Sequence, residues 1–200
     1  GVCVAASIGS ALALERVAGT GALPGEAPWD ERIDGLLGVH AAVWLGAFTS
    51  SAMITPMLVA VAVLAAHARR WERAALAVVT YAASKAIITA GWLTWERARP
   101  ADVADGMLVP VGMASFPSGH TVQVLSVYGL LALWWARSTE RRWEKTLAWV
   151  LVGALTVAVG VGRVRIGAHY PSDVAGGAAL GALWLAGMAW SERALSRARA

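Results

Sequence analysis

Residues 146–162 read TLAWVLVGALTVAVGVG, an apolar run without a single charged side chain. Its length is close to the about 20 residues that a helix needs to cross a bilayer. Similar blocks occupy residues 39–66, 74–95, 121–136 and 174–190, and a shorter one occupies residues 2–14. The pattern predicts an all-α, polytopic membrane protein, a bundle of six transmembrane helices whose first span is short or truncated.

The bulk composition agrees with a membrane location. Hydrophobic residues make up 58% of the 200 residues and charged residues 15%, against about half and about a quarter in soluble domains. The net charge of +4 comes mostly from arginines at span ends, which is typical of membrane topology and lipid contact and not of nucleic-acid binding. Cys3 is the single cysteine, so an internal disulfide is excluded. We interpret residues 1–200 as one integral-membrane domain, and no feature identifies a protein partner.

Three basic clusters indicate how the spans are oriented. They lie at residues 69–73, 137–145 and 193–199, and the positive-inside rule predicts that all three face the cytoplasm. The connections at 15–38, 96–117 and 163–173 then all lie outside. We expect a plasma (inner) membrane protein whose site faces the extracytoplasmic side.

The chemically unusual residues occur at those outer connections. Pro117-Ser118-Gly119-His120 opens one predicted span, Arg97 and Arg99 follow another, and a further group, Arg163, His169 and Asp173, lies between the last two. Ionisable residues embedded in apolar spans indicate a functional site. Two histidines, an aspartate and arginines are the groups needed to transfer a phosphoryl group through a histidine.

Each of these residues also has an ordinary structural interpretation. Arg97 and Arg99 could anchor lipid head groups, and Arg163 could snorkel from a helix end. Residues 117–119 could form a turn, and Asp173 could cap the helix that follows it. Their gathering at one predicted membrane face favours the functional interpretation.

At these residues the chain resembles the type 2 phosphatidic acid phosphatase superfamily, in its membrane lipid phosphate and polyprenyl pyrophosphate phosphatase branch. The family pattern is Lys-(six residues)-Arg-Pro, then Pro-Ser-Gly-His, then Ser-Arg-(five residues)-His-(three residues)-Asp. Arg99-Pro100 matches the end of the first part, and residues 117–120 match the second in full. The third part is matched by Arg163, His169 and Asp173, with Gly162 in place of its serine. The motif core spans about residues 92–173.

The resemblance implies a role for each matched residue. His169 would attack phosphorus, and Asp173 would orient it. His120 would protonate the departing oxygen and then activate water. The phosphate oxygens would be held by Arg99, Arg163, Ser118 and Gly119.

The resemblance implies no cofactor, and we expect activity without a metal ion. No cluster of carboxylates typical of a Mg²⁺ site accompanies the motif residues in the sequence. Asp102 and Asp105 are close together, but two loop carboxylates are more often simply solvated.

The chain departs from the family pattern at Trp92, which stands where the first motif has its lysine. Lys85 lies two helical turns earlier, near mid-bilayer, where it would snorkel or pair with a threonine or serine inside the bundle. Arg97 and Arg165 are the candidates to supply the missing charge, as auxiliary phosphate ligands.

The expected function is hydrolysis of a phosphate or pyrophosphate ester of an amphiphilic lipid, with a polyprenyl pyrophosphate favoured, through a phosphohistidine at the outer membrane face. The alternatives are a lipid phosphotransferase that uses the same intermediate and a weakly catalytic lipid-binding relative. A transporter or scaffold fits the motif spacing less well.

Overall fold

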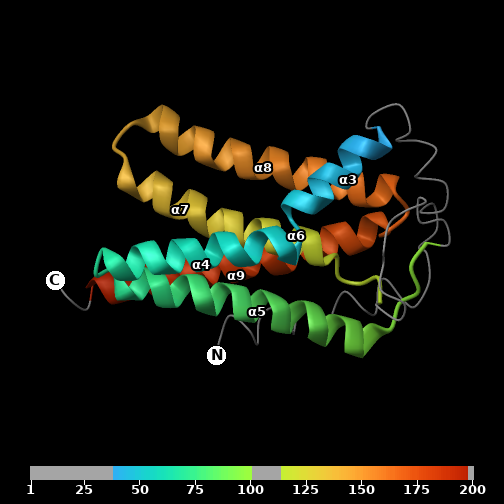
Figure 1. Ribbon diagram of the computed structural model, residues 1–200, viewed down its shortest axis with the longest axis horizontal. Helices are drawn as coiled ribbons and strands as arrows, with labels where there is room; N and C mark the ends of the chain where they lie inside the picture. Colours follow the sequence, from blue (N-terminus) through green and yellow to red (C-terminus); the bar gives the residue numbers. More distant parts are fainter. Residues whose placement is uncertain (1–37, 101–113, 198–200) are drawn as a thin grey trace.

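The structure is a computed structural model that describes residues 38–100 and 114–197. Every element in these two ranges is helical (Figure 1). Four helical stretches within them are long and apolar enough to cross a membrane: His40–His67, Trp71–Trp95, Arg142–Arg165 and Pro171–Ala194. The described part of the chain is therefore all-α, and its apolar helices indicate an integral membrane protein. The total of six spans stays a prediction, and the block at 2–14 lies outside the described residues.

The apolar block at 39–66 lies within one stretch long enough to cross a membrane, but it is not one straight helix. It forms α3 (Val39–Phe48) and α4 (Ser51–His67). At the break, the Thr49 hydroxyl donates to the carbonyls of Leu45 and Gly46, and the Ser50 hydroxyl donates to that of Ala47. Such side chains compete with the helical backbone bonds. Beyond the break, α4 packs along α5 (Trp71–Trp95), whereas α3 packs against α8 (Arg142–Arg165).

The block at 121–136 is a continuous helical run with an altered middle. It consists of α6 (Gly119–Gln123), the π-helical segment η1 (Val124–Tyr128) and α7 (Gly129–Ser138). Single π turns inside α-helices occur frequently at functional sites. This one begins directly after the helical turn that carries His120.

The polar connections gather at one end of the bundle. Figure 1 shows the C-terminal ends of α5 and α8 beside the N-terminal ends of α6 and α9 (Pro171–Arg197). The segments 96–100, 114–118 and 166–170 therefore come together there. The sequence motifs lie on these segments and on the first and last turns of the helices they join.

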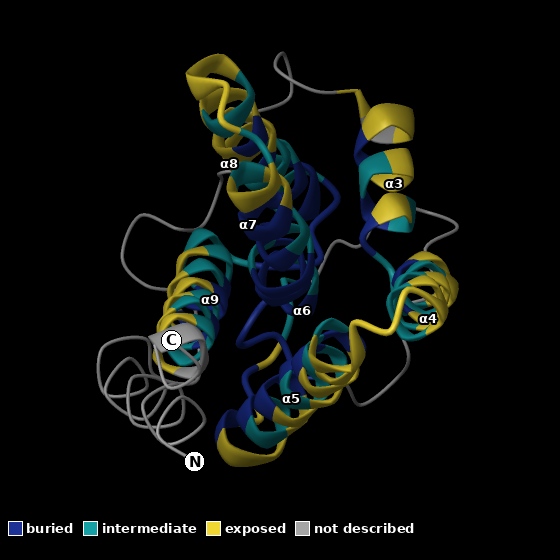
Figure 2. Cartoon of the chain, turned by 90° about the vertical axis from the view of Figure 1, so that its left-hand side faces the viewer, coloured by how far each residue is buried: buried dark blue, intermediate teal, exposed yellow. Residues whose placement is uncertain are grey.

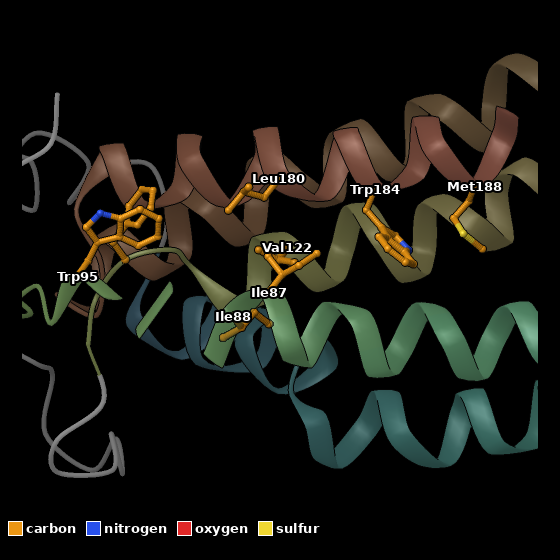
Figure 3. Packing of buried hydrophobic residues seen from close by; sticks show 8 residues of the cluster. Ile87, Ile88, Trp95, Val122, Leu180, Trp184 and Met188 are labelled. Atoms are coloured by element: carbon orange, nitrogen blue, oxygen red, sulfur yellow. The ribbon is translucent and has the colours of Figure 1, made fainter. Parts of the chain in front are cut away.

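A column of buried apolar side chains supports this end. Figure 2 shows the buried residues on the facing sides of the helices, with α6 at the centre. The column joins α5, α6 and α9 (Figure 3) and consists of Ile87, Ile88, Trp95, Phe116, Val122, Leu180, Trp184 and Met188. Trp95 meets Phe116 edge to face at 4.7 Å between ring centroids, a favourable aromatic geometry. The segment leading into residues 117–120 is thereby fixed to the end of α5.

Candidate active site

One ring nitrogen of His169 forms a hydrogen bond to the backbone, and the other carries a lone pair. Its Nδ1 lies 2.8 Å from the backbone carbonyl oxygen of Ser115. A carbonyl oxygen only accepts hydrogen bonds, so Nδ1 carries the proton and Nε2 carries the lone pair. Nε2 lies 3.4 Å from Nη1 of Arg99. The lone pair of Nε2 is therefore next to the guanidinium of Arg99.

Burial keeps the imidazole neutral. The His169 side chain is 2% exposed, and this burial lowers its pKa to about 4, with Arg99 and Arg163 also lowering it and Asp173 opposing them. The residue lies in the connection between α8 and α9. At neutral pH it is consequently in the form that can act as a nucleophile.

Asp173 lies next to His169 but does not bond it directly. Its Oδ2 is 3.7 Å from Nδ1 of His169, which is too long for a hydrogen bond. Oδ2 instead accepts from the Ser115 hydroxyl and from the Tyr170 backbone N–H, the latter at 2.8 Å. Ser115 thus links the two residues, since its carbonyl holds the histidine and its hydroxyl holds the aspartate. Sequence reasoning missed Ser115 because a backbone carbonyl leaves no signature in the sequence.

The carboxylate of Asp173 also forms a hydrogen bond that caps the N-terminal end of α9. Pro171 occupies the first helical position, where its missing N–H costs nothing. The bond from the Tyr170 N–H to the Asp173 side chain corresponds to one of the two bonds of a capping box. The capping interpretation and the functional interpretation of Asp173 are therefore compatible.

Arg97 forms a buried ion pair with Asp173. Its Nη1 lies 2.6 Å from Asp173 Oδ1 and 2.6 Å from the Ser172 hydroxyl, and both charged side chains are fully buried. Its guanidinium carbon lies 4.3 Å from the centre of the Tyr170 ring. These contacts join Arg97 to Asp173, and the role of auxiliary phosphate ligand expected for Arg97 from the sequence stays a prediction.

Two further arginines surround His169. Arg99 donates to the backbone carbonyls of Ala168 at 2.8 Å and Ala114 at 3.2 Å. Arg163 is buried in the last turn of α8, close enough to Arg99 for their charges to interact. Within the described residues, the buried Nε of Arg163 has no hydrogen-bond partner. A buried, incompletely bonded guanidinium is costly, and an anion bound there would satisfy it.

The Pro-Ser-Gly-His segment enters the same site. His120 is close enough to Arg163, His169 and Arg99 for its imidazole to interact with their charges. Ser118 is buried, and its backbone N–H donates to the Asp173 carbonyl at 3.0 Å. A Cβ added at Gly119 would make only ordinary contacts, with Ile88 and Trp92. Packing against the protein therefore does not require a glycine at this position.

A glycine of α9 is required for the segment to fit. A Cβ at Gly177 would lie 2.7 Å from the Ser118 backbone oxygen and 3.2 Å from Cβ of Thr121. Real side chains do not approach this closely. Gly177 therefore allows α9, which carries Asp173, to lie directly against the first turn of α6, which carries His120.

Trp92 packs against the segment where the family pattern has a lysine. Its indole Nε1 donates to the Pro117 carbonyl at 3.4 Å, and its ring lies near Gly119. Lys85 lies deeper in the bundle and donates to the Ser51 hydroxyl, in agreement with the predicted polar pairing.

The expectations for Arg165 and for a metal ion also stay predictions. Arg165 lies in the last turn of α8 and is partly buried, and its auxiliary role stays a prediction. In the part of the chain that the structure describes, no three His, Cys, Asp or Glu side chains are grouped so that they could hold a metal ion. Asp102 and Asp105 lie outside that part.

Comparison with known proteins gives a consistent family assignment. Residues 73–197 match the family model described as the PAP2 superfamily. The chain is 37% identical over 89 residues to phosphatidylglycerophosphatase B of Bacillus subtilis, covering 44% of this chain and 42% of that protein. It is 38% identical over 82 residues to the bacitracin transport permease protein BcrC of Bacillus licheniformis, covering 41% and 36%. The match therefore spans about two fifths of these relatives' length.

A solved structure has a similar fold. The crystal structure of a transmembrane PAP2-type phosphatidylglycerolphosphate phosphatase from Bacillus subtilis superposes with a TM-score of 0.75 at 21% identity. The superposition covers 96% of this chain and 98% of that one. At this identity the likeness establishes the fold.

Proposed function

The chain belongs to the PAP2 superfamily, and from this membership we propose that it is a membrane lipid phosphatase acting through a phosphohistidine on His169. The observation that carries the proposal is a neutral imidazole nitrogen beside one arginine, close to a second arginine whose buried Nε lacks a hydrogen-bond partner in the described part of the chain. Nε2 of His169 is available beside Arg99, and the buried Nε of Arg163 has no partner among the described residues.

The proposed reaction has two steps. Nε2 of His169 forms a bond to phosphorus while the bond to the lipid oxygen breaks, and His120 gives that oxygen a proton. His120 then takes a proton from water as the water oxygen displaces Nε2 from phosphorus. Such proton transfer is typically worth about 10²- to 10⁴-fold in rate.

Arg99 and Arg163 hold the phosphoryl oxygens as charge develops, together with Ser118 and the backbone of Gly119. Arg97, Ser115 and Asp173 keep His169 in place.

The substrate is an amphiphile whose phosphate lies at head-group depth, because the site is at one end of a bundle of apolar helices. We propose that this end faces the extracytoplasmic side of the plasma membrane. A polyprenyl pyrophosphate fits this orientation and is the favoured substrate. No step requires a metal ion, so we propose metal-independent turnover.

Phosphatidylglycerol phosphate is a second candidate, supported by Trp92. An indole in place of the lysine removes one cation from the phosphate site, which favours the less charged phosphomonoester over a diphosphate. A protein named phosphatidylglycerophosphatase B is among the relatives. Replacement of Trp92 by lysine should then raise the preference for the diphosphate.

Phosphate release in detergent with EDTA tests the proposal. Polyprenyl pyrophosphate, phosphatidylglycerol phosphate and phosphatidate are each offered to wild type and to His169→Ala. We expect release by wild type alone. Release that depends on added Mg²⁺ would contradict metal independence. A new phosphorylated lipid appearing with acceptor lipids would indicate the transferase, and tight binding without release would indicate a silent lipid-binding relative.

A further inference from the structure

A polar cluster lies inside the bundle beneath the candidate site. Lys85 of α5 donates to the hydroxyl of Ser51, the first residue of α4. With the Gln123 amide oriented to satisfy its neighbours, Gln123 Oε1 accepts from Lys85 Nζ at 2.9 Å and Nε2 donates to the Thr49 carbonyl at 2.9 Å. The ammonium also lies 5.6 Å from the Tyr81 ring centre. One lysine therefore joins α5, the α3–α4 break and the end of α6.

The α3–α4 break is hydrogen-bonded to residues at both ends of the π-helical segment η1. Gln123 immediately precedes η1, and Tyr128 is its last residue. Gln123 bonds the Thr49 carbonyl, and the Tyr128 hydroxyl donates to the preceding carbonyl, that of Phe48, at 2.7 Å. Consecutive carbonyls of the break thus hold both ends of the π turn. The direction of α6 depends on these bonds as well as on the helix that follows it.

The charge on Lys85 requires an explanation. An ammonium in a membrane-spanning helix is costly, and within the described residues no carboxylate forms a salt bridge with Lys85. A methionine would fill similar space without that cost. Gln123 follows His120 by three residues, so the two side chains share one face of α6. His120 is also within electrostatic range of Lys85.

We propose that Lys85 is a positioning residue for His120: by holding Gln123 and Ser51 together it fixes the first turn of α6, and with it the proton donor, relative to the phosphate-binding arginines. This inference rests on the proposed function, in which His120 is the general acid. The family motif does not contain Lys85, which lies seven residues before the motif's own lysine position.

Leaving-group dependence tests the proposal. The quantity measured is kcat/KM, which reports steps up to departure of the leaving group, for a lipid phosphomonoester and for p-nitrophenyl phosphate. Lys85→Met and Gln123→Leu should lose about 10- to 100-fold with the lipid ester, as expected for a misplaced catalytic group. With the aryl ester, whose leaving group hardly needs an acid, they should lose less than about 3-fold. Gln123→Glu keeps an acceptor for the ammonium but loses the donor to the Thr49 carbonyl, so it should lose less kcat/KM with the lipid ester than Gln123→Leu.

Two further variants make the result specific. Thr80→Val removes another buried polar contact of α5, that with Trp184 Nε1 at 3.4 Å, and should leave the ratio between the two substrates unchanged. In a His120→Ala background, the addition of Lys85→Met should not lower kcat/KM for the lipid ester any further. Equal losses on both substrates, or additive losses with His120→Ala, would overturn the proposal.

A spectroscopic measurement separates this inference from the proposed function. In ¹⁵N-histidine-labelled protein in detergent, Lys85→Met should shift the His120 resonances and leave those of His169 in place. An unchanged His120 signal would overturn the positioning role whether or not the wild type hydrolyses any substrate. Failure of wild type to release phosphate, with the His120 shift present, would overturn the proposed function alone.

Discussion

At the scale of single residues, His169 can act as a nucleophile only through the ring nitrogen that carries no proton. The contact between Nδ1 and the Ser115 carbonyl fixes the proton on Nδ1. The lowered pKa, about 4, keeps the ring neutral above that pH. Both properties belong to the resting protein and can be measured without substrate.

The ¹⁵N spectrum of His169 provides that measurement. In labelled protein, with His169→Gln used for assignment, we expect the Nδ1–H tautomer at pH 7 and a titration midpoint near pH 4. As pH falls through the midpoint, the ring gains a proton and the nucleophile is lost. A midpoint near the ordinary 6.5, or an Nε2–H tautomer, would contradict the proposed site.

Arg97 provides a second prediction at this scale. Because its ion pair with Asp173 is fully buried, Arg97→Met leaves an uncompensated charge, a change that typically costs about 3–5 kcal/mol. We expect kcat to fall and the double variant Arg97→Met/Asp173→Asn to be no worse than the more damaged single variant. If Arg97 were instead a phosphate ligand, KM would rise and the two losses would add. Arg165→Met, the same substitution at an arginine in the last turn of α8, is the comparison for the effect of Arg97→Met on kcat and KM.

At the scale of helices, the sequence predicted where most of the helices lie. It did not predict where a helix breaks or where its hydrogen-bond register changes. Apolar blocks identified α5, α8 and α9 because hydropathy reports which residues face lipid. The same signal runs through Thr49–Ser50 without interruption, although the helix breaks there, because hydroxyls bonded to backbone carbonyls hardly alter hydropathy. The π turn at Val124–Tyr128 is equally invisible, since a one-residue change of register leaves composition unchanged.

Gly177→Ala tests the contact between α9 and α6. The added methyl would meet the Ser118 backbone oxygen at 2.7 Å, so the helices must move apart and separate His120 from the His169–Asp173 pair. A shift of about 1 Å can cost about 10²-fold. Gly153→Ala on α8 is the control, because nothing lies within 4 Å of its added Cβ. Full activity in Gly177→Ala would mean that this close packing is unimportant for the reaction.

At the scale of the whole molecule, the motifs occupy one end of the bundle. The sequence predicted this gathering from the order of the spans, and the structure brings His120, Arg163, His169 and Asp173 together there. The role of Ser115 and the pairing of Arg97 with Asp173 could not be predicted, because both depend on how the segments 96–100 and 114–118 fold over the start of α9. Nor does residue spacing indicate that Lys85 would reach Gln123.

Cysteine labelling tests the orientation of the molecule. In a Cys3→Ser background, Ala98→Cys reports the site end and Glu140→Cys reports the opposite end, where the Glu140 side chain is 99% exposed. A membrane-impermeant maleimide added to intact bacterial cells should label the first variant, and the second only after permeabilisation. The reverse pattern would place the site on the cytoplasmic side.

The central claim is that His169 carries the phosphoryl group. The most direct measurement is rapid quenching of the enzyme with ³²P-labelled aryl phosphate, followed by mapping of the label. We use His120→Ala in parallel, because loss of the base should slow hydrolysis of the intermediate and increase its amount. We expect an acid-labile, alkali-stable label on His169 that His169→Ala lacks. Turnover with no label, or with the label on another residue, would contradict it.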